Sequence, residues 1–182
     1  MFRSKRRELQ ENIAKTNIDI LISLIPMLLA AFLVYQVTPI LVILSAVVAS
    51  ELAEVIFSLL IQRKKETLKD LSGIVIGALT GLALAPFTPL YVAAFAGAMA
   101  TLFGKVIYGE TEKKIFNPVI LGKLFVLTFF PAVLASNSAA WANPEVLNIS
   151  ESTSLPSLIL TDRGIIGELS IIAMVLGAIY LL

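Results

Sequence analysis

The densest run of side chains that could support chemistry is Ser-Glu-Ser-Thr-Ser-Leu, at residues 150–155. A hydroxyl that accepts a phosphoester must be accessible and have small neighbours, and Thr153 has a serine on each side. Serine and threonine clusters also occur as solvated loops that cap helices. From these residues alone both interpretations remain open, and the solvated loop is the more ordinary one.

Two carboxylates form a second candidate. Glu51 and Glu54 lie inside an apolar run and are three residues apart, which places them on one face of a helix. Ionisable groups are costly within a membrane, so we expect the pair to face a polar cavity or a partner. They are either ion-pathway groups, or neutral side chains that are hydrogen-bonded within a bundle or lie at a subunit contact. Glu168, near the outer end of the last apolar run, is interpreted as an interfacial residue.

The composition indicates that the elements which position these residues lie in a lipid bilayer. The chain has 182 residues, of which 58% are hydrophobic, and its mean hydropathy of +0.91 is far above that of a soluble domain. The net charge of +1 gives no basis for binding nucleic acid. Without cysteine or histidine the chain cannot by itself build iron–sulfur, zinc or common haem sites. A redox role would need an organic cofactor or partner subunits.

Six apolar runs can cross a bilayer as helices, because lipid offers the backbone no other hydrogen-bond partner. The third is short and rich in glycine, and the fifth contains two prolines. We therefore predict an all-α polytopic membrane protein with about six transmembrane helices, some short or broken. The six runs are Ile18–Val37, Ile40–Ile61, Leu71–Ala85, Leu90–Tyr108, Asn117–Ala135 and Ile165–Leu182.

Positive charges predict the orientation of these helices. Lysines and arginines gather before the first run, after the second and around the connection between the fourth and fifth, whereas only Arg163 is left for the other side. We expect a multi-pass protein of the plasma (inner) membrane with a cytoplasmic N-terminus. Its parts are a basic cytoplasmic tail (1–17), a bundle of about five spans (18–135), an external polar loop that contains the hydroxyl run (136–164) and a sixth helix (165–182).

The short, interrupted runs also predict a function. Such segments are typical of ligand sites near the membrane midplane, with helix N-termini facing anions. Asn117 and Gly122, in the fifth run, are the candidate cofactor-binding residues of such a site. Small residues also allow helices to pack closely, so composition leaves both interpretations open.

Three segments resemble the membrane-subunit family shared by the Rnf complex, as its D subunit, and the sodium-pumping NADH:quinone reductase, as its B subunit. They are residues 72–109, with Phe-Gly-Lys near their end, residues 113–131, with Phe-Asn-Pro, and residues 164–182, with Ile-Gly-Glu. The resemblance implies part of an inverted-repeat, urea-transporter-like fold of about ten spans, of which this chain is the first half and the start of the second. Since the last run stops at Leu182 without a polar anchor, we expect the native chain to continue.

The resemblance also implies a covalent flavin. In the family, FMN is joined through its phosphate to the threonine of a Ser-Gly-Ala-Thr-x-Leu type sequence, in the loop between the Phe-Asn-Pro and Ile-Gly-Glu helices. Ser150, Thr153 and Leu155 match this pattern, while Glu151 stands at the place of the glycine. Thr153 is therefore the expected acceptor and Ser150 a recognition residue, which makes the external loop 136–164 the candidate flavin site. A second, non-covalent flavin is compatible with the resemblance.

Two functions are consistent with these features. The resemblance implies a membrane subunit of an Rnf-type complex that translocates Na+ or H+, acting with membrane and peripheral subunits as a ferredoxin:NAD+ or related oxidoreductase and inactive alone. The alternative is a small-solute channel or secondary transporter of urea-transporter-like fold without a redox cofactor. The carboxylates Glu51 and Glu54 and the broken runs suit that alternative equally well.

The predicted orientation can be tested with single-cysteine variants, because the native chain has no cysteine. A membrane-impermeant maleimide added to intact cells should label Asn143→Cys, in the external loop. Gln62→Cys, in the cytoplasmic loop, should react only after the cells are permeabilised. Labelling of Asn143→Cys from the cytoplasmic side alone would contradict the orientation.

Overall fold

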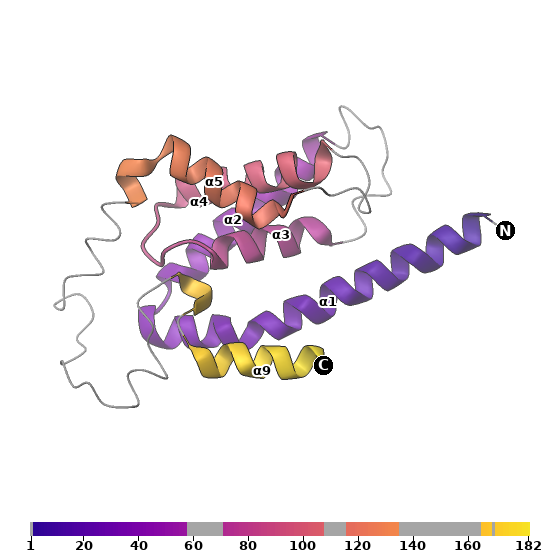
Figure 1. Cartoon of the computed structure of the whole chain (residues 1–182), viewed down its shortest axis with the longest axis horizontal. Coiled ribbons are helices and arrows are strands. Elements are labelled where there is room, and N and C mark those ends of the chain that lie inside the picture. Colours follow the sequence, from indigo (N-terminus) through magenta and orange to yellow (C-terminus); the bar gives the residue numbers. More distant parts are fainter. Residues whose placement is uncertain (1, 58–70, 108–115, 135–164, 169) are drawn as a thin grey trace.

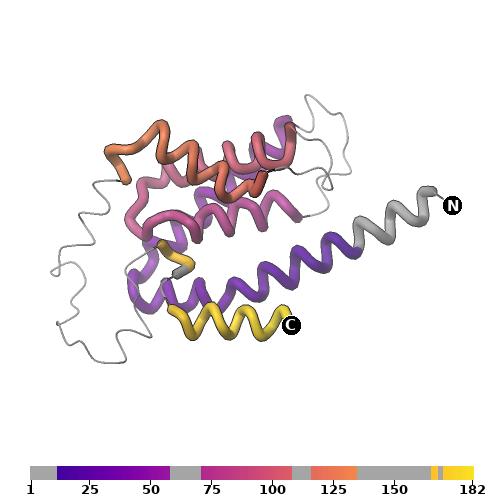
Figure 2. Tube along the Cα trace, in the orientation of Figure 1, coloured from indigo at the N-terminus to yellow at the C-terminus, as the bar shows by residue number. Residues whose placement is uncertain are grey.

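The structure, a computed structural model, describes residues 2–57, 71–107, 116–134, 165–168 and 170–182 (Figures 1 and 2). The described regular elements are all helical, which confirms the all-α prediction. They are α1 (Phe2–Tyr35), α2 (Thr38–Phe57), α3 (Ser72–Leu82), α4 (Leu90–Thr101), the π-helix η3 (Leu102–Val106), α5 (Pro118–Phe129), the 3₁₀ turn η5 (Ile166–Glu168) and α9 (Ile171–Leu181).

Helices α1 and α2 are long and apolar enough to cross a membrane. The candidate spans are Asn12–Tyr35 and Thr38–Phe57, while the four shorter apolar helices correspond to the remaining predicted runs. Helix α1 begins at Phe2, so the basic N-terminal residues continue the first span as helix. Its 34 residues reach about 50 Å, more than the ~30 Å hydrocarbon core, and its N-terminal half projects past the other helices in Figure 1.

Helix α2 lies between α3 and α4, and glycines allow the backbones to approach closely. A Cβ atom placed on Gly77 of α3 would lie 2.6 Å from the Cα atom of Val47, and one on Gly97 of α4 would lie 3.0 Å from the Cα atom of Ala46. Ala46 is fully buried between them. The glycines of α3 thus serve close helix packing, one of the two interpretations that the sequence left open.

The π-helix η3 follows α4 directly and packs against the start of α5. The amide of Ile107 donates a hydrogen bond of 3.0 Å to the carbonyl of Leu102, five residues earlier. Gly104 lies inside this turn and faces Pro118, where an added Cβ atom would be 2.5 Å from the proline Cα atom. The Phe-Gly-Lys and Phe-Asn-Pro segments, more than ten residues apart in sequence, therefore meet in the structure.

Helices α1 and α9 pack against each other, as Figure 1 shows. A Cβ atom on Gly177 would lie 2.5 Å from the carbonyl oxygen of Ser23. The run predicted as one helix from Ile165 is divided, because Ser170 has an extended backbone and caps α9 by accepting a bond of 3.3 Å from the amide of Ala173. The preceding turn is tied to the bundle by a 3.0 Å bond from the amide of Ile166 to the carbonyl of Leu84.

The contact between α2 and α3 leads to a stability prediction. Gly77→Ala should lower the stability of the purified protein in detergent by about 1–3 kcal/mol, because the new methyl group meets the backbone of Val47 and the helices must separate. Gly167→Ala is the matched control, since its added carbon would lie 3.4 Å from the nearest atom, which is ordinary contact. Thermal unfolding that shifts equally in both variants would contradict this packing.

Candidate functional site

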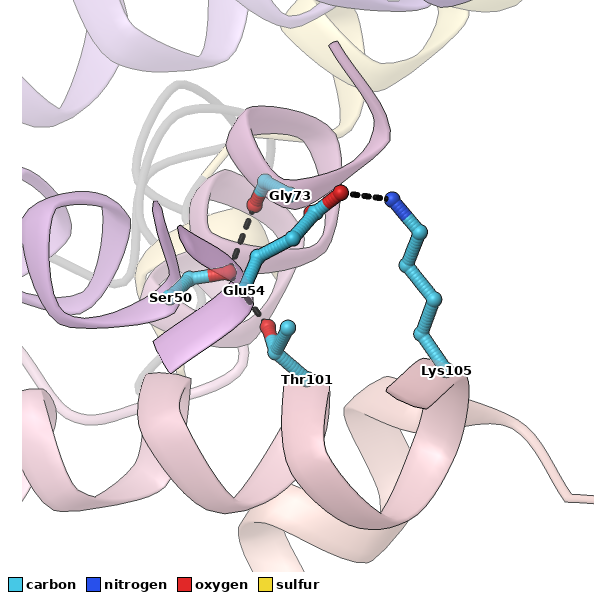
Figure 3. Close-up of polar contacts among 5 residues, drawn as sticks. All are labelled: Ser50, Glu54, Gly73, Thr101 and Lys105. Carbon is cyan, nitrogen blue, oxygen red and sulfur yellow. Dashed lines mark hydrogen bonds and ion pairs between the residues drawn. The ribbon is translucent and has the colours of Figure 1, made fainter. Parts of the chain in front are cut away.

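A buried ion pair joins α2 to η3. The ammonium of Lys105 contacts Oε1 of Glu54, and only 6% and 3% of the two side chains are exposed (Figure 3). Removing two charges from water is costly, and the cost is offset only when the charges stay paired in good geometry. This buried pair forms the centre of the candidate site.

Lys105 is a site residue that the sequence-based prediction missed. Its place beside the connection between the fourth and fifth runs favours interpretation as an orienting charge. The structure instead turns its side chain into the bundle. A signal was present, since Lys105 falls within the apolar run Leu90–Tyr108, where an ionisable group calls for a partner just as Glu54 does.

A layer of hydroxyl groups lies one helical turn away from the ion pair. The Ser50 hydroxyl donates a 2.7 Å hydrogen bond to the carbonyl of Gly73. That bond uses its only proton, so in the second contact the Thr101 hydroxyl is the donor and Ser50 Oγ the acceptor. Both hydroxyl-bearing residues are fully buried. The layer links α2, α3 and α4 through groups that are satisfied internally.

The two layers also define the relative direction of the helices. Ser50 and Glu54 are four residues apart on α2, and their partners Thr101 and Lys105 are four residues apart in the same order. Helices α2 and α4 therefore run in parallel. Two spans separated by one intervening span must run the same way across a membrane, so this agrees with the alternating topology predicted from the sequence.

The carboxylates of Glu51 and Glu54 lie close together, next to Gly73 at the start of α3. A Cβ atom added to Gly73 would lie 2.5 Å from Oε1 of Glu51 and 2.5 Å from Oε2 of Glu54, so these oxygens are at most 5.0 Å apart (twice 2.5 Å). The prediction that both residues lie on one helix face is confirmed. Helix α3 begins here without a side-chain cap, and its positive N-terminal end favours nearby anions.

The structure gives Asn117 and Gly122 local roles. Asn117 caps α5, its side-chain oxygen accepting a 2.9 Å hydrogen bond from the amide of Val119. Gly122 is buried at a helix crossing, where an added Cβ atom would lie 2.8 Å from the carbonyl oxygen of Ala96 and 3.0 Å from the methyl group of Thr80. The described contacts of these two residues are thus capping and packing.

Thr153 and Ser150, with the whole loop 136–164, lie outside the described residues. The segments on either side of this loop are described. Before it, Phe130 packs edge-on against Tyr91 at the start of α4, and after it, Ile166 binds Leu84 just beyond the end of α3. The ion pair lies at the other ends of these helices, near the start of α3 and the end of α4. The loop is therefore attached at the end of the bundle opposite the ion pair.

Similarity to known proteins extends over nearly the whole chain. The sequence model of the NQR2, RnfD, RnfE family matches residues 6–182. Over 178 residues the chain is 25% identical to the D subunit of the Na(+)-translocating ferredoxin:NAD(+) oxidoreductase complex of Acetobacterium woodii, a match covering 90% of this chain and 56% of the relative. Over 69 residues it is 41% identical to the D subunit of the ion-translocating oxidoreductase complex of Ectopseudomonas mendocina. That match covers 38% of this chain and 20% of the relative. The chain thus spans about half the length of the first of these relatives, and a fifth of the second is matched.

The hydroxyl layer can be tested within a single helix. Ser50→Ala should cost about 1–3 kcal/mol of stability, because the Gly73 carbonyl and the Thr101 hydroxyl both lose a buried partner. Ser45→Ala is the control, since that hydroxyl bonds only to the carbonyl of Val42 in its own helix. Thermal unfolding in detergent measures both variants. An equal loss of stability in the two variants would show that the hydrogen bonds between helices stabilise the fold no more than a bond within one helix does.

Proposed function

This chain belongs to the NQR2, RnfD, RnfE family, and we propose that it is a membrane subunit of an Rnf-type electron-transport complex that translocates ions. The match over residues 6–182 carries the proposal, and two relatives named as D subunits of ion-translocating oxidoreductases support it. In this proposal Na+ or H+ crosses the plasma membrane while electrons pass between ferredoxin, or a related donor, and NAD+, or a related acceptor. The subunit works only with its membrane and peripheral partners.

The proposed electron carrier is FMN joined to Thr153. The support is the Ser-x-x-Thr-x-Leu spacing of Ser150, Thr153 and Leu155 and the family match around it. When bound, a flavin accepts and donates electrons. The Thr153 hydroxyl would form the phosphoester, and Ser150 would be recognised by the attaching enzyme. Asn117 and Gly122 stay candidate cofactor-binding residues of this proposal, with a cap and a helix crossing as their described contacts.

The proposed ion pathway begins at Glu51 and Glu54. Both carboxylates face the start of α3, and the described ends of α2 and η3, which precede the basic segments 58–70 and 108–115 in sequence, lie near them. The distribution of positive charge favours a cytoplasmic location for this end, with the flavin loop outside. A cation would then enter where carboxylates attract it, at one end of a largely apolar bundle.

Covalent flavin attachment gives the direct test. When the chain is produced in a host with the flavin transferase, its band on a denaturing gel should fluoresce under ultraviolet light. Thr153→Ala should abolish the fluorescence without impairing membrane insertion, because the residue lies in a polar loop. Thr153→Ser should retain part of it, since the hydroxyl survives, and Ser150→Ala should lose less than Thr153→Ala.

The outcomes separate three cases. If Thr153→Ala keeps its fluorescence, the acceptor is another hydroxyl of the same run, and Ser152→Ala and Ser154→Ala identify it. If the parent chain is colourless although the transferase modifies a known substrate in the same cells, the covalent flavin is excluded. Loss of fluorescence in Thr153→Ala alone supports the proposed electron carrier.

A further inference from the structure

Helix α5 lies along one edge of the bundle, against α4, and carries a lysine on its outer face (Figure 1). Lys123 is exposed, although the residue before it, Gly122, is buried at the crossing with α4. Within the part of the chain that the structure describes, the Lys123 amine takes part in no hydrogen bond or ion pair. Its neighbours on the outer face are mostly apolar and include Ile120, Leu124 and Leu127, which are 65%, 54% and 49% exposed.

Lys123 lies at the level of the middle of the bundle. A Cβ atom on Gly122 would be 2.8 Å from the carbonyl oxygen of Ala96 and 2.9 Å from the Cβ atom of Ala100, so this part of α5 is level with those two residues. They occupy the centre of the apolar helical stretch Leu90–Val106, which places them about 12 Å from either end at 1.5 Å per residue. The stem of a lysine reaches only about half that far, so snorkelling does not bring the amine out of the hydrocarbon region.

We propose that the outer face of α5 is the docking surface for a transmembrane helix of a partner subunit, and that this helix carries an aspartate or glutamate at the depth of Lys123. The surface consists of Ile120, Lys123, Leu124 and Leu127. The inference rests on the proposed membership of a multi-subunit membrane complex. It adds the face of this chain that meets a partner and the chemistry that the partner must carry.

The physical reason is that lipid cannot satisfy the lysine amine. Its N–H groups are donors in either protonation state, and a donor without an acceptor in hydrocarbon is strongly unfavourable. Ionisable side chains within membrane spans therefore face a protein partner or a polar cavity. A carboxyl group offers two oxygens and retains an acceptor whether or not it is protonated. The bundle already uses this combination within its spans, at Lys105 and Glu54.

Thr128, on the same face of α5, has no comparable need for a partner. Its hydroxyl donates a hydrogen bond of 2.9 Å to the carbonyl of Leu124 in its own helix. A threonine that bonds to its own helix can face lipid without an unpaired donor. Of these two exposed polar side chains, Lys123 is therefore the one that distinguishes a protein contact from a lipid contact.

Crosslinking in the purified complex tests the surface. The photoreactive amino acid p-benzoylphenylalanine is placed at Leu127, four residues after Lys123 on the same face. Illumination should join this chain to another membrane subunit, within an apolar segment that contains an aspartate or glutamate, and mass spectrometry identifies the segment. The same variant produced without the other subunits is the control. Adducts with lipid alone, with a second copy of this chain, or with a segment that lacks an acidic residue would overturn the inference.

An exchange of the two side chains tests the chemistry. Lys123→Glu should reduce the amount of the crosslinked subunit that co-purifies with this chain at least about tenfold, because two acidic groups then meet at the interface. Lys123→Arg, which keeps N–H donors at this place, should co-purify as the wild type does. Replacing the acidic residue of the crosslinked segment by lysine should restore co-purification with Lys123→Glu. Unchanged co-purification in Lys123→Glu, or a loss that the exchanged pair does not restore, would overturn the acidic partner.

The same preparations separate this inference from the proposed function. If no other membrane subunit co-purifies with the wild-type chain, the proposed membership of a complex fails, and the docking surface fails with it. A complex that assembles and transfers electrons while position 127 crosslinks only to lipid would preserve the proposed function and overturn the docking surface alone.

Discussion

A buried ammonium and a buried carboxylate must stay together, and the arrangement of α2, α3 and α4 depends on this constraint. Separating Lys105 from Glu54 would leave each charge in a medium that cannot solvate it. The pair fixes the end of α4 against α2, and the Ser50–Thr101 contact one turn away fixes the same two helices again. Because Ser50 also binds the carbonyl of Gly73, α3 is included in the same polar unit.

The polar unit requires close packing, and the small residues of these helices provide it. Apolar burial gives little drive for association in lipid, so contact between backbones and hydrogen bonds between helices must supply it. Gly73, Gly77 and Gly81 recur every four residues on the face of α3 that meets α2. A larger side chain at Gly73 would occupy the place of the two carboxylates. The glycines of α3 therefore serve two purposes: they allow close packing against α2, and Gly73 leaves room for the charged cluster.

The sequence determined some of these features locally and left others to tertiary contacts. The six runs, the all-α class and the shared face of Glu51 and Glu54 follow from hydropathy and helical period, which nearby residues determine. The partner of Glu54 is 51 residues away, and the π turn that presents Lys105 has no simple compositional signature. The break at Ser170 was missed because its hydroxyl caps a helix inside a continuous apolar stretch. Thr153 remains a prediction from motif spacing, since it lies outside the described residues.

The opposite placement of the two candidate sites limits how the proposed electron and ion steps can be coupled. The charged cluster lies at the start of α3, and the flavin loop is attached just beyond its end, where Ile166 binds Leu84. The 11 residues of α3 span about 16 Å, which separates the charged cluster from the described segment that follows loop 136–164. The packed helices are the described connection between these two ends of the bundle. Helix α3 is the direct route, because its first turn contacts both carboxylates and its far end meets the segment that follows the flavin loop.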